Sequence, residues 1–440
     1  MKFVDKIKMN GVVGAGGAGF PTHIKMAAEV DWLLANGAEC EPLMCKDNEL
    51  MIHFADEIIR GMQYAAESVQ AKQCVIGIKS KNKEAIHSLR CAIKKSNLSI
   101  IIHEFEDYYP AGDEYEIVAT ITGKPIPAAG IPLDVGAVVC NVESLYNISN
   151  AMKNKPVIDK FLTIAGEVKN PITVSVPIGT SYEDLLALAG GTNLNTLAIC
   201  ENGLMMGSFT KDLQKYVTKQ TGGIVILPET SQLVKRSQKT LPEMHRIGQS
   251  ACDQCNYCTE LCPRYLLGYD IQPHLVMRSL GFTAMGTDYW SEYASLCCKC
   301  GLCTLYACPE NLFPREACIQ SIKNLSPQAH TDSKKAQVIK LHPMRSSRHV
   351  SSQMLMQRLG VTKYDIAAKY KSTSFHPGTV KIPLLQHTGV PAKPIVNIGD
   401  KIKRGQLIGS IPEDELGSPI HASIDGTVRE IGAEFIAITR

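Results

Sequence analysis

The sequence predicts a multidomain protein in which α/β and all-β domains flank a cysteine-rich helical segment. Apolar strands alternate with helical patterns over the first 155 residues, which is typical of an α/β domain with a largely parallel sheet. Eight regularly spaced cysteines then lie in two runs between Cys252 and Cys308. From Val380 onward the chain reads as short strands separated by turn residues, which indicates a small β domain.

Length and composition exclude several classes of protein. A chain of 440 residues can hold three or four domains, and 45% hydrophobic with 20% charged residues is ordinary for a folded soluble protein. The longest apolar stretches are interrupted by glycine or proline, so we expect no membrane insertion. A net charge of +3 is too small to indicate nucleic-acid binding. Clustered reduced thiols favour the cytoplasm.

The first domain, predicted at residues 1–155, places polar segments directly after its strands. Because ligands of open α/β sheets bind at the carboxyl ends of the strands, these segments predict a binding site. For any single acidic residue there, a helix N-cap or a solvated loop is the simpler interpretation. The expected strands are 32–35, 74–78, 100–105 and 137–141, the expected helices are 47–70, 81–96 and 143–153, and the polar segments are 36–42, 108–114 and 141–144.

A glycine-rich loop precedes this pattern. Gly14, Gly16 and Gly19 satisfy G-x-G-x-x-G, and Pro21 begins a predicted helix, so the loop could bring bare backbone to a phosphate. The strand that should precede a Rossmann loop is missing, because residues 2–10 are charged and irregular. An ordinary dinucleotide site is therefore disfavoured, and from the motif alone a plain glycine turn is equally compatible.

The next segment, 156–235, changes to a β pattern. Residues 161–176 predict a hairpin, and 182–189 predict a helix that ends at Gly190 and Gly191.

The cysteine runs predict two [4Fe–4S] clusters in a ferredoxin-like helical domain at 245–325. The first run is C-x2-C-x2-C-x3-C-P, the bacterial ferredoxin pattern, and the second has one extra residue before its final Cys-Pro. In two-cluster ferredoxins the fourth cysteine of each run ligates the other cluster. This predicts a first thiol set of Cys252, Cys255, Cys258 and Cys308, and a second thiol set of Cys262, Cys297, Cys300 and Cys303.

Two alternatives concern these cysteines. Cys298 could replace Cys297 after a shift of one residue, although only Cys297 keeps the x2 spacing, which leaves Cys298 as a free thiol. Zinc ribbons use two CxxC pairs separated by a longer loop, whereas three cysteines follow in immediate succession here, so zinc is disfavoured.

Five motifs resemble the flavin-carrying, NADH-binding subunit of respiratory complex I and the related C subunit of Rnf electron-transfer complexes. They are residues 14–22 (GAGGAGFPT), 36–42 (NGAECEP), 46–47 (KD), 109–114 (YPAGDE) and 141–144 (NVES). The resemblance implies FMN as cofactor and NADH as electron donor. It implies FMN contacts from Gly14, Gly16, Gly17, Gly19, Lys25, Asn36, Glu39, Asn141 and Ser144. It implies nicotinamide-side contacts from Phe20, Lys25, Glu41, Tyr109 and Glu114, with Glu41 and Glu114 as the catalytic residues.

The remaining segments resemble modules of the same relatives. Residues 156–235 look like their β-grasp (SLBB-like) module, and 376–440 look like a barrel-sandwich hybrid domain, with 383–389 (PLLQHTG) as in Rnf. No lysine lies between Gly409 and Ser418, where a swinging arm would need one, so the domain is expected to be structural or to dock a partner. The segment 326–375 is predicted to be a basic helical connector, with Lys334, Lys335, Arg345, Arg348 and Arg358.

The order of these parts resembles PduS-type cobalamin reductases of bacterial microcompartments over nearly the full length. The resemblance implies NADH-dependent reduction of cob(III)alamin to cob(II)alamin and cob(I)alamin, with an adenosyltransferase and microcompartment shell proteins as partners. One alternative is an Rnf-like conduit to a non-corrinoid acceptor. Another is a non-enzymatic iron–sulfur scaffold.

Overall fold

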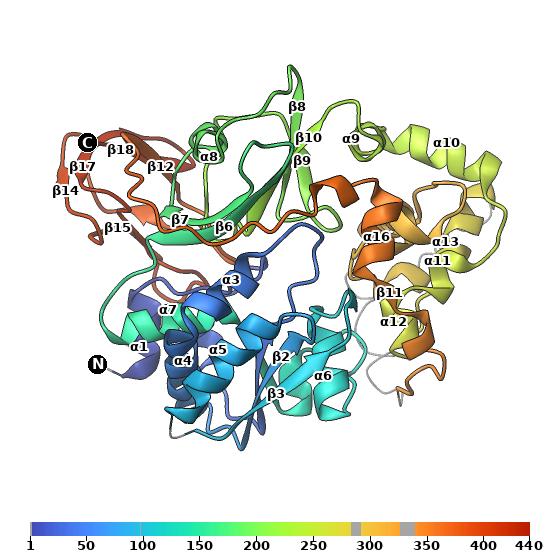
Figure 1. Ribbon diagram of the computed structural model, residues 1–440, viewed down its shortest axis with the longest axis horizontal. Coiled ribbons are helices and arrows are strands. Elements are labelled where there is room, and N and C mark those ends of the chain that lie inside the picture. Colours follow the sequence, from blue (N-terminus) through green and yellow to red (C-terminus); the bar gives the residue numbers. More distant parts are fainter. Residues whose placement is uncertain (1, 97, 283–291, 326–338) are drawn as a thin grey trace.

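The computed structural model describes residues 2–96, 98–282, 292–325 and 339–440. Figure 1 shows an α/β unit at the bottom, a mixed sheet above it, a small barrel at upper left and a helical unit at the right. The multidomain α/β and β fold class predicted from the sequence is present as these separate units. Among the described residues, no helix is long and apolar enough to cross a membrane.

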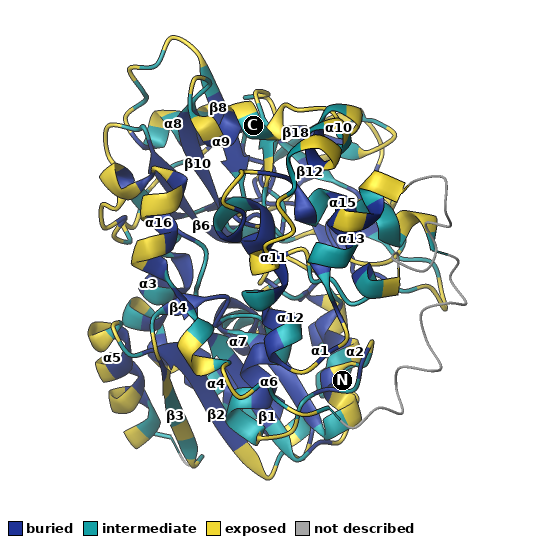
Figure 2. Cartoon of the chain, turned by 90° about the vertical axis from the view of Figure 1, so that its right-hand side faces the viewer, coloured by how far each residue is buried: buried dark blue, intermediate teal, exposed yellow. Residues whose placement is uncertain are grey.

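The N-terminal unit is built on a parallel sheet in the order β3-β2-β1-β5, and all four predicted strands are present. Their apolar residues fill a core with the flanking helices, and Figure 2 shows β1 and β2 largely buried, whereas the edge strand β3 is mostly half-buried or exposed. The strands are β1 (Trp32–Gly37), β2 (Gln73–Lys79), β3 (Ile100–Phe105) and β5 (Ala137–Asn141), and the main helices are α4 (Ala55–Ser68), α5 (Lys83–Lys94), α6 (Glu114–Thr122) and α7 (Val142–Met152).

Two details of this unit differ from the sequence prediction. The helix expected at 47–70 is two helices, α3 (Lys46–His53) and α4, which meet at Phe54. The Phe54 ring packs edge-on against Tyr146 and Phe161 at centroid distances of 5.4 and 5.3 Å, and this contact accounts for the break. The segment before the glycine loop is a helix, α1 (Phe3–Met9), so a Rossmann strand is indeed missing there.

The second unit is a five-stranded mixed sheet in the order β7-β6-β10-β8-β9. The predicted hairpin and helix are both present, and Gly190 and Gly191 follow the helix with positive φ, as a C-terminal stop requires. The elements are β6 (Asp159–Gly166), β7 (Ile172–Pro177), α8 (Tyr182–Leu188), β8 (Leu197–Glu201), β9 (Ser208–Thr210) and β10 (Gly223–Pro228).

The cysteine-rich unit is helical, and a short strand joins the connector behind it to the α/β unit. Strand β11 (Val350–Ser351) pairs with β4 (Tyr108–Tyr109). Of the predicted basic connector, 326–338 with Lys334 and Lys335 lies outside the described residues, and the main helix of the rest is α16 (Ser352–Leu359). The other helices are α9 (Gln232–Ser237), α10 (Leu241–Ala251), α11 (Tyr257–Glu260), α12 (Pro263–Leu266), α13 (Pro273–Ser279) and α15 (Pro314–Asn324).

The C-terminal barrel shares a core with the α/β unit. Leu33 of β1 and Ile76 of β2 belong to the same buried apolar cluster as Ile382 and Ile438 of the barrel. The barrel is therefore packed against the first domain and is not a tethered appendage. Its sheets are β12-β18-β17-β14 and β13-β15-β16, made of β12 (Thr379–Pro383), β13 (Lys393–Pro394), β14 (Lys401–Ile402), β15 (Leu407–Ser410), β16 (Ile420–His421), β17 (Gly426–Ile431) and β18 (Phe435–Thr439).

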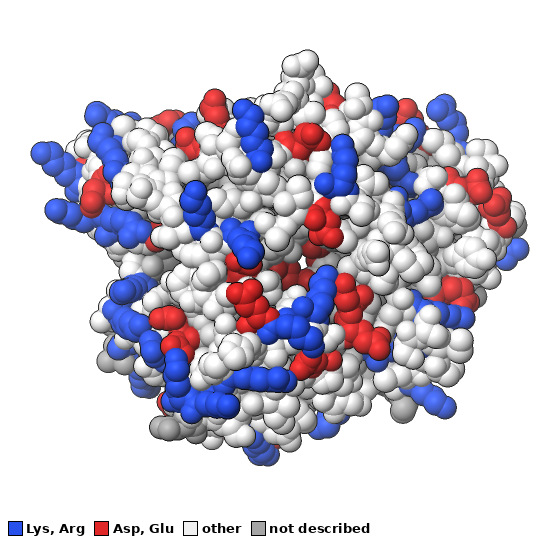
Figure 3. All heavy atoms as spheres, in the orientation of Figure 1, with Lys and Arg blue, Asp and Glu red and all other residues white. Residues whose placement is uncertain are grey.

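Basic and acidic side chains are interspersed over the face of the molecule drawn in Figure 3. This distribution agrees with the small net charge of +3.

Candidate flavin and iron–sulfur sites

The glycine loop lies at the switch point of the parallel sheet. Strand β1 pairs with β2 on one side and with β5 on the other, and Asn36 and Asn141 are register partners at the carboxyl ends of β1 and β5. The Ala15 amide donates to Ser144 Oγ over 2.9 Å, and a Cβ at Gly16 would lie 3.4 Å from Asn141. The loop therefore covers the first turn of α7, where a phosphate is favoured by free backbone amides.

Gly17 is the position in this loop that leaves space for a ligand. Its φ is +112°, and a Cβ built there would meet nothing within 4 Å. Gly16, Gly17 and Ala18 are exposed, while Gly19 is buried. The loop thus presents bare backbone to the solvent side of the sheet edge, which fits a flavin phosphate.

A buried ionic cluster supports this edge from below. Lys46 Nζ lies 2.7 Å from Asp47 Oδ1 and 2.8 Å from Glu143 Oε2, and Lys160 also pairs with Glu143. Burial alone would lower the pKa of Lys46, but Asp47 and Glu143 raise it above its usual value. Asn141 Nδ2 donates to Asp47 Oδ2 over 2.8 Å, so the cluster fixes a predicted flavin residue.

Glu39 caps the N-terminus of α3 within the same region. Its carboxylate accepts the amides of Asp47 and Asn48 over 3.1 and 3.3 Å. Burial, aided by Asp47, raises the pKa of Glu39 to about 7. Glu143 lies in the predicted polar segment 141–144, whereas Lys160 was missed by sequence reasoning because its partner is 17 residues away and in another domain.

Lys25 and Glu114 stand at the open side of the site. Their side chains are 31% and 41% exposed and 3.4 Å apart, so a ligand could reach both. Lys25 Nζ also donates to the Val139 carbonyl over 3.1 Å, which ties it to β5. Asn36 Nδ2 donates to the Gly112 carbonyl over 2.9 Å, so it links β1 to the segment that carries Glu114. Phe20 is half-buried at the end of the loop.

Glu41 and Tyr109 lie where the α/β unit contacts the mixed-sheet unit and the helical unit. The Glu41 carboxylate accepts the amides of Met205 and Met206 over 2.9 and 3.0 Å. Burial raises the pKa of Glu41 to about 7. The Tyr109 hydroxyl donates to the Cys300 carbonyl over 2.8 Å, and the residue is 1% exposed. Their nicotinamide-side roles stay predictions, and the structure gives both residues partners in these neighbouring units.

The fold brings together each predicted thiol set. Cys308 reaches back to the first run, and Cys262 reaches forward to the second, so the members of each set line a common cavity. Cys298 lines the second cavity as well, and the Cys297 thiol contacts the buried Cys318. The choice between Cys297 and Cys298 as a ligand therefore stays open. Four thiols around one cavity are the donors that a [4Fe–4S] cluster requires.

The extra residue in the second run has a structural explanation. Cys303–Ala307 forms a π-helical turn directly before Cys308. A π turn takes up one more residue than an α turn, so the longer spacing still delivers Cys308 to the first thiol set.

The second thiol set lies against the α/β unit. Arg264, two residues after Cys262, pairs with Asp113, with Nη2 3.1 Å from Oδ2, and its guanidinium stacks 3.9 Å over the Tyr115 ring. Arg315 Nη1 donates to the Met205 carbonyl over 2.8 Å and also lines the second cavity. The second set is therefore the nearer one to the flavin side.

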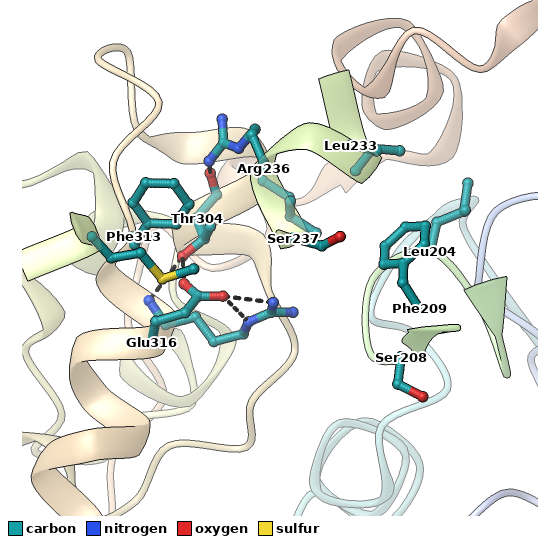
Figure 4. A pocket seen from close by; sticks show the side chains of 13 residues that line it. Leu204, Ser208, Phe209, Leu233, Arg236, Ser237, Thr304, Phe313 and Glu316 are labelled. Carbon is teal, nitrogen blue, oxygen red and sulfur yellow. Dashed lines mark hydrogen bonds and ion pairs between the residues drawn. The ribbon is translucent and has the colours of Figure 1, made fainter. Parts of the chain in front are cut away.

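A separate cavity of about 270 Å³ lies between the mixed sheet and the helical unit. Figure 4 shows Leu204 and Phe209 on one side, facing Thr304, Phe313 and Glu316 on the other. Arg236 Nη2 donates to the Thr304 and Leu312 carbonyls over 2.9 and 3.2 Å, and so links α9 to the helical unit that forms the second wall of the cavity. No sequence pattern predicts this cavity, because its walls come from three distant segments.

The chain matches four families in the order of its domains. Residues 7–150 match the Nuo51 FMN-binding domain, 161–209 the SLBB domain, 251–313 the 4Fe-4S dicluster domain and 365–439 the RnfC barrel sandwich hybrid domain. These matches confirm a flavin-binding and an iron–sulfur domain. In fold, the chain is similar to an NAD+-reducing [NiFe]-hydrogenase chain in its H2-reduced state, with a TM-score of 0.50, 18% identity and coverage of 74% of this chain and 63% of that one.

Two curated relatives extend the likeness over the full length. The proteins named cobalamin reductase PduS from Citrobacter freundii and Salmonella typhimurium are each 36% identical over 437 residues, which cover 99% of this chain and 96% of the relative. The chain is an oxidoreductase that belongs to the PduS cobalamin reductase family.

Proposed function

We propose that the protein is an NADH-dependent reductase that delivers electrons to cob(III)alamin and cob(II)alamin through FMN and two [4Fe–4S] clusters. The observation that carries this proposal is the hydrogen bond from Tyr109 to the Cys300 carbonyl, because it joins the flavin-binding unit to the second thiol set without an intervening domain. The name of the PduS relatives supports the corrinoid acceptor.

Different residues would serve the flavin site and its contact with the second thiol set. Bound FMN would accept two electrons as hydride and release them singly, and clusters would carry one electron each. The exposed backbone at Gly17 and the first turn of α7 would hold the flavin phosphate. Lys25 and Glu114 would orient the nicotinamide at the open side. Glu41 and Tyr109 would fix the distance between flavin and second set.

The acceptor end would lie beside the first thiol set. A groove of about 940 Å³ passes Tyr257, which lies between Cys255 and Cys258, and also Ala307 and Pro309, which flank Cys308. Tyr257 and Met354 are 55% and 54% exposed on it. An apolar surface of this size suits a large corrin ring. Arg348 and Arg358, which also line the groove, suit the phosphate of a base-bearing corrinoid.

The reduced corrinoid would then pass to an adenosyltransferase. The setting would be a microcompartment with shell proteins, as the resemblance to PduS-type reductases implies.

The proposal is tested by anaerobic absorption spectra, recorded before NADH is added, after NADH is added, and again after cob(III)alamin is added. We expect NADH to bleach the flavin and cob(II)alamin to form. Bleaching without corrinoid reduction would favour an Rnf-like conduit to another acceptor. A protein that NADH never bleaches would favour the iron–sulfur scaffold.

A further inference from the structure

Two domains that come much later in the sequence donate hydrogen bonds to the glycine loop of the predicted flavin site. Thr388 of the barrel donates its hydroxyl to the Ala18 carbonyl over 2.9 Å and its amide to the Gly19 carbonyl over 3.1 Å. Gln220, in the loop before β10, donates to the same Ala18 carbonyl over 3.3 Å. Two side chains, one 202 and one 370 residues away in sequence, thus converge on one loop oxygen.

Lys219 holds the other end of the loop. Its ammonium donates to the Gly11 carbonyl over 2.7 Å and to the Pro419 carbonyl over 3.0 Å, with Ser418 Oγ at 3.4 Å. The Lys219 backbone amide donates to Gln386 Oε1 over 3.0 Å. One buried lysine of the SLBB-type unit therefore ties the start of the glycine loop to two segments of the barrel.

The same contacts explain why positions 11 and 19 are glycine. A Cβ at Gly19 would lie 2.1 Å from Gln220 Nε2, and a Cβ at Gly11 would lie 2.6 Å from Lys219 Nζ. Both residues have positive φ, +65° and +67°. Gly17, in contrast, has positive φ with open space. The N-terminal glycines therefore serve two purposes: Gly17 faces the ligand space, and Gly11 and Gly19 admit the side chains that hold the loop.

We propose that Lys219, Gln220 and Thr388 are positioning residues for the flavin, and that the C-terminal barrel acts as a clamp on the glycine loop. The shared apolar core makes the clamp rigid, because the barrel cannot shift relative to the α/β unit without opening buried surface. A loop held at both ends keeps its amides aligned before the phosphate arrives, which lowers the entropy lost on binding. The inference rests on the flavin site and is independent of the electron acceptor.

The test is the rate at which FMN leaves the intact, cluster-loaded protein, followed by the rise in flavin fluorescence after anaerobic dilution. We expect the double variant Thr388→Val/Gln220→Ala to lose FMN about tenfold faster, since two hydrogen bonds to Ala18 are removed. Lys219→Met should have a similar effect. Thr379→Val, which removes an exposed barrel hydroxyl paired with Thr439, and Lys215→Met, which removes an exposed lysine of the same unit, are matched controls.

Iron and sulfide content and near-ultraviolet circular dichroism are measured on every variant. A faster loss of FMN with unchanged iron, sulfide and dichroism supports the clamp. A wild-type rate in the double variant overturns it, and so does a loss of FMN that occurs only together with loss of iron. The double variant decides the matter if Lys219→Met does not fold, because Thr388 is exposed and its amide remains. The test does not measure corrinoid reduction, so its result does not depend on which molecule accepts the electrons.

Discussion

The Tyr109 hydroxyl lies 2.8 Å from the carbonyl oxygen of Cys300, 191 residues further along the chain. Tyr109 belongs to β4 of the flavin-binding unit, and Cys300 is a predicted cluster ligand, so we expect this hydrogen bond to set the distance between the two predicted redox sites. We expect Tyr109→Phe to keep its FMN and iron but to transfer electrons from flavin to cluster more slowly. Loss of one buried hydrogen bond should lower the free energy of unfolding by about 1 kcal/mol.

Stopped-flow absorption after mixing with NADH separates flavin reduction from cluster reduction. Tyr115→Phe is the matched control, because it removes a hydroxyl that bonds within the α/β unit, to Gly130. Equal cluster-reduction rates in Tyr109→Phe and the wild type would contradict a role for this contact.

We expect the Glu41 carboxyl, which lies between the α/β unit and the mixed sheet, to make the free energy of unfolding depend on pH. Burial raises its pKa to about 7 from 4.5, so between these values the unfolded chain loses a proton that the folded chain keeps. The folded state then binds more protons, and the free energy of unfolding falls as pH rises from about 4.5 to 7, by on the order of 2 kcal/mol. Glu41→Gln cannot ionise, so it should lose this slope and gain stability relative to wild type at pH 8.

Thermal unfolding at pH 5.5, 6.5 and 8, followed by flavin fluorescence, measures this slope. Glu106→Gln, at an exposed site, is the control and should follow the wild type. A Glu41→Gln variant with the same pH profile as the wild type would show that the carboxyl titrates normally.

Local patterns predicted much of this molecule, and long-range contacts explain the rest. The four parallel strands and both cysteine runs follow from apolar periodicity and from spacing, which are properties of a short window of sequence. The break at Phe54 depends on rings from residues 146 and 161, so no window around residue 54 contains it.

The predicted flavin site likewise combines local sequence patterns with long-range contacts. The glycine loop and the polar strand ends were visible in the sequence. The contacts that Lys160, Lys219 and Thr388 make with this site were not, because each contact forms only where another domain packs against the loop or the residues that support it. The π-helical turn at Cys303–Ala307 could have been suspected from the extra residue, yet spacing alone does not say which backbone form absorbs it.

Gly17 offers a direct test of the ligand space. Replacing it by tryptophan would fill the open volume beside the exposed backbone and force a bulky residue to adopt a φ of +112°. We expect Gly17→Trp to contain no FMN while it retains its iron. Flavin content by fluorescence after acid release, with Gly360→Trp as a control at another open glycine of positive φ, checks this. Full FMN content in Gly17→Trp would refute the loop as the phosphate site.

The crossed thiol sets predict an effect at a distance along the chain. Cys308→Ala should remove the cluster of the first run, more than forty residues upstream, because Cys308 lines that cavity. Iron and sulfide analysis should give four of each in the variant against eight in the wild type. Cys298→Ala should keep eight if Cys297 is the ligand. Loss of the same EPR signal in Cys308→Ala and Cys300→Ala would contradict the crossing.

The groove beside the first thiol set gives the last prediction. Tyr257 and Met354 are large side chains that are 55% and 54% exposed there, so we expect them to contact the corrin ring. The double variant Tyr257→Ala/Met354→Ala should raise the KM for cob(III)alamin about thirtyfold, because two apolar contacts of roughly 1 kcal/mol each are lost. NADH oxidation with ferricyanide, which can take electrons from the flavin, should be unchanged. Ile398→Ala, at an exposed apolar residue of the barrel, is the control. An unchanged KM for corrinoid in the double variant would place the acceptor elsewhere, with the cavity of Figure 4 as the next site to alter.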